Sequence, residues 1–318
     1  MVKRILYLTG ILAVLLGLSA CKPKESNINP LRTSTPLPTS TAKDFPVVEQ
    51  QACQLAKYEV LRTREAQGDL IAWDPGGTRL AYIGPAGNSN WFSGRINLTE
   101  GPDFKETRSL APEALAVGGL AWQPSGGLLA FVAFRQPDTY TVMTINPDTG
   151  TAVDLFGSQD ARTDPWGGSK AVVGWQNGSV LRVLSSCGDD CDQILDIDTA
   201  TGQINQYGEQ LRKAKDRLWP HTAVKTFEPT LFPPAMSKPS WASRISPQMK
   251  QPEWSSDGKK VVYIDNFINA WVLMIDQKVQ YQLNTPSVDV QEAKWAPDDR
   301  YLGVRTDDQV LVFDTECK

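Results

Sequence analysis

The sequence has a single histidine, His221, and no net basic charge, since 36 acidic residues outnumber 32 basic ones and the formal net charge is −4. One histidine and no G-x-S-x-G serine motif argue against a Ser–His–Asp catalytic triad. Too few metal-ligand residues lie close together in the sequence for a zinc site. The negative charge argues against recruitment of nucleic acid. We therefore expect no metal, no cofactor and no nucleic-acid partner.

The longest apolar run, residues 5–18, follows Lys3 and Arg4 and is too short to cross a bilayer as a helix. It is typical of the core of a secretory signal. It ends in Leu-Ser-Ala-Cys at residues 18–21, which resembles the lipobox of bacterial lipoproteins. That resemblance implies cleavage between Ala20 and Cys21, acylation of Cys21, and anchoring to a bacterial membrane on its periplasmic or cell-surface face. The alternative is an ordinary secretory signal with an incidental cysteine.

The signal peptide is therefore predicted at residues 1–20, and a lipidated tether at residues 21–47. The tether is rich in proline, serine and threonine and has little that could pack, so we expect it to be extended. The folded body is predicted over residues 48–318.

Four further cysteines allow three disulfide pairings, and an exported protein lives where disulfides persist. Cys187 and Cys191 lie close together between two strand-like runs, which favours a local bridge. That pairing leaves Cys53 with Cys317, and their bridge would join the start of the body to its end.

One short pattern recurs along the body: a tryptophan, a turn of small and polar residues, then an apolar strand. The five tryptophans are Trp73, Trp122, Trp175, Trp254 and Trp295. Successive members lie 49, 53, 79 and 41 residues apart. Periods of about 40–50 residues that each hold several short strands are typical of β-propeller blades. The pattern predicts an all-β chain.

Each repeat divides into four predicted strands, except the last, which has three before the chain ends. The missing strand has a candidate at residues 57–61, so we expect an N-terminal strand to complete the last blade and close the ring. The glycines assigned to the turn glycine of the pattern include Gly77 and Gly127.

The tryptophan and the turn resemble the WD40-like repeats of TolB-type β-propellers, which read W-S-P-D-G followed by a basic residue and a strand. The segment from Trp254 to Lys259 matches except at Ser256, and Trp175 begins the most degenerate copy. The resemblance implies a propeller and no particular activity. We predict five four-stranded blades; the alternative is six, which is common in that family.

The long third spacing predicts an irregular insertion at residues 209–250. Its first part, residues 209–219, has the periodicity of a short surface helix, and seven prolines follow between residues 220 and 252. The aromatic residues Phe227, Phe232 and Trp241 are candidates for a partner-binding patch; alternatively, they cover the gap between blades.

Aspartates 148, 198, 257 and 298 occupy turn positions, whereas Asp69, Asp265 and Asp289 lie near strand ends where they could reach a channel mouth. We expect a non-catalytic binding or scaffolding module, with a monomeric body and a protein or glycan partner in the cell envelope. The alternative is a carbohydrate-active enzyme with a carboxylate pair in the propeller channel.

Overall fold

The computed structural model describes residues 46–62, 68–86, 93–110, 115–135, 139–157, 170–186, 191–211, 250–265, 269–286 and 289–317. These residues belong to one compact unit, Ser40–Lys318, and are built from strands and turns without a helix. Accordingly, the described part of the chain contains no helix long and apolar enough to cross a membrane.

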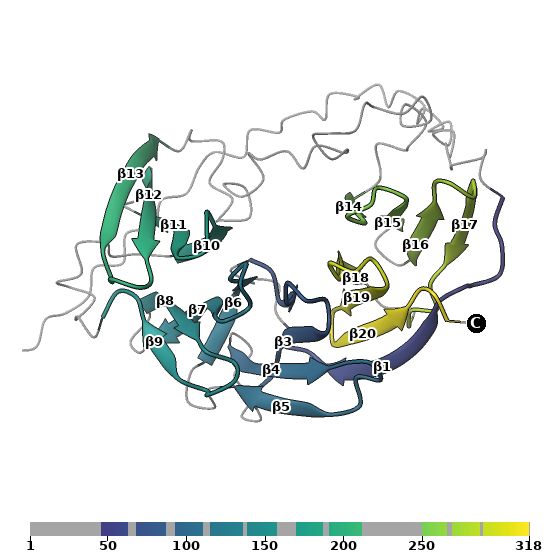
Figure 1. Cartoon of the computed structure of the whole chain (residues 1–318), viewed down its shortest axis with the longest axis horizontal. Coiled ribbons are helices and arrows are strands. Elements are labelled where there is room, and N and C mark those ends of the chain that lie inside the picture. The colour runs from purple at the N-terminus through teal and green to yellow at the C-terminus, as the bar shows by residue number, and fades with distance from the viewer. Residues whose placement is uncertain are drawn as a thin grey trace, which may run out of the picture. The chain divides into compact units, whose positions relative to one another are not determined.

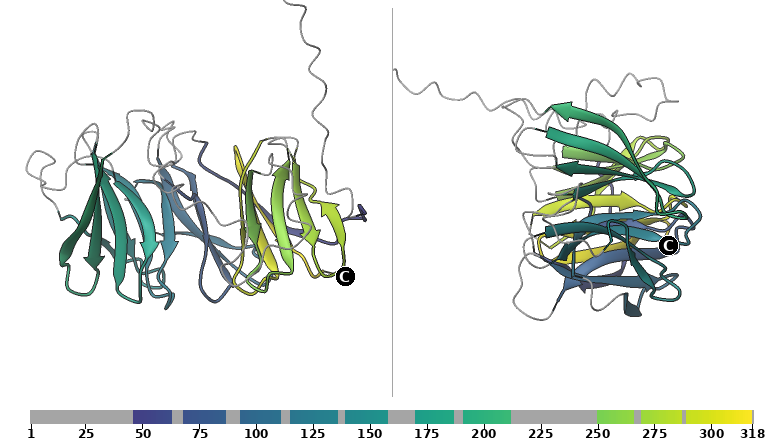
Figure 2. Two further views of the ribbon diagram at one scale, coloured as in Figure 1. Left: turned by 90° about the horizontal axis from the view of Figure 1, so that it is seen from above. Right: turned by 90° about the vertical axis from the view of Figure 1, so that its left-hand side faces the viewer.

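The strands form four-stranded antiparallel units whose strands stand side by side (Figures 1 and 2). Four units consist of consecutive strands, and the fifth combines three consecutive strands with the first strand of the body. Unit 1 comprises β2 (Ile71–Trp73), β3 (Arg79–Pro85), β4 (Gly94–Glu100) and β5 (Thr107–Leu110). Unit 2 comprises β6 (Leu115–Trp122), β7 (Leu129–Arg135), β8 (Thr139–Ile145) and β9 (Ala152–Asp154). Unit 3 comprises β10 (Lys170–Trp175), β11 (Val180–Ser186), β12 (Cys191–Asp198) and β13 (Ile204–Leu211).

Unit 4 comprises β14 (Lys250–Trp254), β15 (Lys260–Asp265), β16 (Asn269–Met274) and β17 (Val279–Gln282). Unit 5 comprises β18 (Val290–Trp295), β19 (Tyr301–Thr306), β20 (Gln309–Asp314) and, from the other end of the body, β1 (Cys53–Glu59). Units 1 and 2 are joined into one eight-stranded sheet by the pair Gly94–Ala116. Repeated four-stranded antiparallel units of this kind are the blades of a β-propeller.

In units 1, 2, 4 and 5 the turn after the tryptophan has a residue with a left-handed backbone four positions later. Gly77, Gly126 and Gly258 occupy this position with φ of 71°, 77° and 69°. The expectation for Gly127 was therefore wrong by one residue. In unit 5 the position is Asp299, with φ 59°. Aspartate tolerates this conformation better than most residues, and its carboxylate accepts bonds from Ser256 N and Asp257 N in the neighbouring turn at 2.5 and 2.9 Å.

The repeat tryptophans link successive units through their indole N–H groups. Trp73, Trp122, Trp175 and Trp295 each donate to the backbone carbonyl of the residue just before the tryptophan of the neighbouring unit. The four bonds are Trp122–Ala72 at 3.0 Å, Trp175–Ala121 at 3.0 Å, Trp295–Glu253 at 3.0 Å and Trp73–Lys294 at 2.9 Å. The bonds connect the units in the order 4, 5, 1, 2, 3, so the first and last repeats are neighbours.

The N-terminal end of the body is tied to units 4 and 5. Strand β1 pairs antiparallel with β20 (Figure 1), and Cys53 forms a disulfide with Cys317 across a sequence separation of 264. The strand begins before the predicted residues 57–61 because pairing with β20 extends back to Cys53. Val48 N donates to the carbonyl of Gln280 on β17, and Gln280 N donates to the carbonyl of Pro46.

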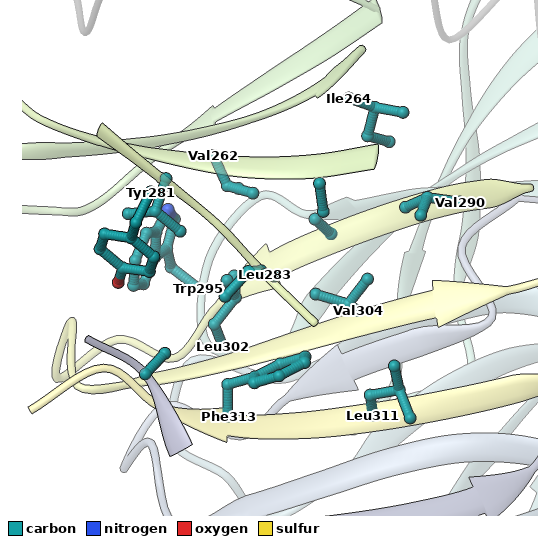
Figure 3. Close-up of a cluster of buried hydrophobic side chains, with 14 of the residues drawn as sticks. Val262, Ile264, Tyr281, Leu283, Val290, Trp295, Leu302, Val304, Leu311 and Phe313 are labelled. Atoms are coloured by element: carbon teal, nitrogen blue, oxygen red, sulfur yellow. The ribbon is translucent and has the colours of Figure 1, made fainter. Parts of the chain in front are cut away.

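The units pack through apolar side chains that alternate along their strands. Between units 4 and 5, Val262 and Ile264 of β15 face Trp295, Val304 and Leu311 of unit 5 in one buried cluster (Figure 3). Alternation with a period of two buries one face of each sheet against each neighbour. The core therefore lies between successive sheets.

The predicted helix at residues 209–219 is wrong at its start. Strand β13 runs to Leu211, and Glu209 pairs with Gln193 of β12. Continuing the hairpin satisfies the backbone groups of these residues, which outweighs the weak helical periodicity. The remainder of the insertion, residues 212–249, lies outside the described residues.

Candidate functional site

A group of charged side chains gathers where unit 5 meets unit 1. Its members lie on or beside the first strands of units 1, 4 and 5, and one lies on the second strand of unit 5. We call it the 5/1 cluster. It comprises Asp69 just before β2, Glu253 on β14, Glu292 and Lys294 on β18, and Arg305 on β19. The strand pairing places Glu292 opposite Arg305, and Glu292 and Lys294 share one face of β18 because they lie two residues apart.

Glu292 is at the centre of the cluster and is only 7% exposed. Its Oε2 atom lies 3.2 Å from Arg305 Nε and accepts a bond of 3.3 Å from the Leu70 backbone N–H of unit 1. Its Oε1 atom is buried and has no hydrogen-bond partner within the described residues. Beside it, Lys294 Nζ lies 3.1 Å from Asp69 Oδ2. The cluster therefore contains two ion pairs, one buried within unit 5 and one joining units 5 and 1.

The surroundings shift the pKa values of the cluster. Burial raises the pKa of Glu292 to about 7, and the negative charge of Asp69 adds to this effect, while Arg305 and Lys294 oppose it. Burial likewise raises the pKa of Glu253. For Lys294, burial favours the neutral form, but the nearby carboxylates outweigh it and its pKa is raised. Lys294 is thus a fixed positive charge, and Glu292 titrates near neutrality.

Chemically, the cluster can exchange a proton at Glu292 and can hold the two units together. The ion pairs neutralise much of its negative charge. Among the described residues, no group of three or more histidine, cysteine, aspartate or glutamate side chains is placed to hold a metal ion.

The acids proposed for a channel mouth lie in different settings. Asp69 belongs to the 5/1 cluster, whereas Asp289 is exposed just before β18. Asp265 ends β15, and its side chain lies outside the described residues. The cluster therefore includes one of the three predicted acids, together with Glu253 and Glu292, which sequence reasoning missed.

Three of the four aspartates assigned to turns make the expected bonds to nearby backbone N–H groups. Asp198 accepts from Ala200 N at 2.9 Å, Asp257 from Lys259 N at 2.9 Å and Asp298 from Arg300 N at 3.0 Å. The fourth, Asp148, also lies in a turn but does not make the expected bond to its own backbone. The Asn146 side chain makes the turn bonds, and Asp148 Oδ1 instead pairs with Arg79 Nη1 of unit 1 at 3.2 Å.

Of the other predicted site residues, Cys53 and Cys317 form the disulfide described above. Strand β12 begins at Cys191, and its predicted partner Cys187 lies outside the described residues, so that bridge stays a prediction. The lipidation site Cys21, the preceding Ala20 and the aromatic candidates Phe227, Phe232 and Trp241 also lie outside them.

No protein-family model matches the sequence, and no curated protein matches it either. Similar solved structures include TolB from Acinetobacter baumannii, with 13% identity, 77% of this chain and 53% of that chain covered, and a TM-score of 0.34. A putative TolB from Agrobacterium tumefaciens has 11% identity, with 74% and 68% covered and a TM-score of 0.36. A chain of the mitotic checkpoint complex has 10% identity, with 85% and 96% covered and a TM-score of 0.43.

The chain spans about half the length of the Acinetobacter baumannii TolB. The assignment of β-propeller blades depends on the strand pairing of the units and on the indole bonds between them. Together these observations give the chain an all-β fold built of propeller blades.

Proposed function

We propose that the protein is a membrane-anchored, extracytoplasmic β-propeller lipoprotein of five blades that binds a protein or glycan of the cell envelope without catalysis. The observation that carries the proposal is the pairing within the 5/1 cluster. Asp69 and Glu292 each lie within ion-pair distance of a basic side chain, at 3.1 and 3.2 Å respectively. The Lys294–Asp69 pair joins units 5 and 1 and the Glu292–Arg305 pair braces unit 5 internally, which suits a rigid scaffold.

The bond from Trp73 to the Lys294 carbonyl supplies one of the contacts that a closed ring needs. It makes the first and last repeats neighbours, as a closed propeller requires. The disulfide between Cys53 and Cys317 supports an oxidising, extracytoplasmic location.

The binding function is tested by cross-linking in intact membranes, followed by recovery of the protein. We expect a specific envelope partner to be recovered with it, and the purified body to leave envelope glycans intact. Recovery of no partner, together with hydrolysis of a glycan by the purified body, would contradict the proposal.

A second candidate function is glycoside hydrolysis. Its support is Glu292, whose raised pKa of about 7 suits a general acid and whose neighbour is the carboxylate of Asp69. Hydrolysis that disappears in Glu292→Gln while the fold is retained would favour this function.

The proposed lipid anchor at Cys21 leads to a separate prediction. Substitution Cys21→Ala should move the protein from the membrane fraction to the soluble fraction, because the acyl chains attached there are the expected membrane contact. Fractionation followed by immunoblotting measures the change, and Cys21→Ala should also abolish incorporation of labelled fatty acid. Retention of the variant in the membrane fraction would disprove the anchor.

A further inference from the structure

The interface between units 5 and 1 differs from the other indole-linked interfaces because it joins the two ends of the folded body. It contains the indole bond from Trp73 to the Lys294 carbonyl, and Leu61 N donates to the carbonyl of Ile83 at 2.8 Å. It also contains the 5/1 cluster. A change of charge at this interface would therefore affect the contact between the first and last repeats.

Glu292 contributes directly to this interface. It is the acceptor for the Leu70 backbone N–H of unit 1, so one carboxylate oxygen is shared between the neighbouring unit and Arg305 of its own sheet. The other oxygen is buried without a hydrogen-bond partner among the described residues. A buried acceptor that lacks a donor costs free energy, more so when it is charged.

Charged groups from each neighbouring element act on Glu292. Asp69, which precedes β2, repels its ionised form, while Lys294 of β18 and Arg305 of β19 attract it. Glu253 of β14 interacts with Lys294 and Asp69, and so contributes negative charge to the same group. The attraction of Lys294 and Arg305 does not fully offset the effects of burial and of Asp69, so the pKa of Glu292 stays raised.

We propose that Glu292 is a pH-sensitive latch between units 5 and 1, which hold each other more tightly when its carboxyl is protonated and separate more readily when it is ionised. Protonation removes the repulsion with Asp69. It also removes the buried negative charge from a carboxyl group whose Oε1 atom has no hydrogen-bond partner among the described residues. This inference concerns the fold itself and does not depend on the anchor or on the partner.

The direction of the effect follows from linkage. Burial raises the pKa of Glu292 to about 7, above its ordinary value, so the folded interface binds a proton more tightly than the opened one. The contribution of Glu292 to holding the units together is fully present below the ordinary glutamate pKa. It is lost as the pH rises through about 7.

The test is native-state hydrogen exchange of residues 68–73, corrected for the intrinsic pH dependence of exchange, between about pH 5.5 and 7.5. In the wild-type protein we expect the opening equilibrium of the Leu70 amide to rise about twenty-fold across this range, since the closed form binds the proton with a pKa of about 7 and the opened form with the ordinary glutamate pKa. Glu292→Gln should reduce the rise to less than about two-fold. The exposed Glu49→Gln is the matched control and should behave as the wild type.

A second variant tests the latch if Glu292→Gln does not fold. Asp69→Asn removes the repulsive charge, so the midpoint of the pH-dependent opening should move to lower pH. A purely structural loss of the Lys294–Asp69 pair would change the amount of opening without moving that midpoint. Opening that does not depend on pH in the wild type, or an unchanged midpoint in Asp69→Asn, would overturn the proposal.

Discussion

Substitution of both Cys53 and Cys317 by serine should lower the free energy of unfolding by about 3–5 kcal/mol. The bridge closes a separation of 264 residues, and the loop-entropy account gives larger stabilisation for longer loops. The bridge also ties β1 to the end of unit 5, where β1 supplies the outer strand of the sheet. Urea unfolding followed by tryptophan fluorescence and by circular dichroism measures the loss.

The matched control is the double substitution of Cys187 and Cys191, whose predicted bridge would close only a short hairpin. The same entropy account gives roughly 2 kcal/mol or less for so short a loop. A reducing agent should bring the wild-type protein close to the variant lacking Cys53 and Cys317. Equal losses from the two double substitutions would contradict the assignment of the long bridge as the main covalent restraint.

Much of this fold follows from one repeated residue. The tryptophan spacing locates each unit, and strands are present at all the positions predicted from it. The N-terminal strand was predictable because unit 5 is one strand short before the chain ends. The direction of the indole bonds could not be predicted from the sequence. Each acceptor is a backbone carbonyl of another unit, and a carbonyl has no sequence signature.

The 5/1 cluster was missed, although a signal was present. The residue before the repeat tryptophan is small in units 1 to 3, namely Ala72, Ala121 and Gly174. In units 4 and 5 it is Glu253 and Lys294. Charged residues beside a buried tryptophan on a first strand imply partners across an interface. The sequence alone does not identify these partners. Asp69 is far from Lys294 in sequence, and the arrangement of the units brings the two side chains together.

The second large effect is expected at Arg305. Substitution Arg305→Met should cost about 3–4 kcal/mol at pH 8, since removing one partner of a buried ion pair leaves the other charge uncompensated. Arg305 and Glu292 are 8% and 7% exposed, and their charged atoms lie 3.2 Å apart. Urea unfolding at fixed pH measures the cost. The control is Arg62→Met, which breaks an exposed pair with Asp308 and should cost less than about 1 kcal/mol.

The pH dependence of this cost distinguishes a lost charge from lost packing. Arg305 opposes the rise in the pKa of Glu292, so its removal raises that pKa above the wild-type value of about 7. At pH 5 the Glu292 carboxyl of the variant is protonated, and the loss of stability should be smaller than at pH 8. Replacing Arg305 and Glu292 together by methionine should recover most of the stability at pH 8, because neither charge then remains buried. If the cost of Arg305→Met were the same at pH 5 and pH 8, and the double substitution recovered nothing, the side chain would act through its packing and the ion pair would contribute little.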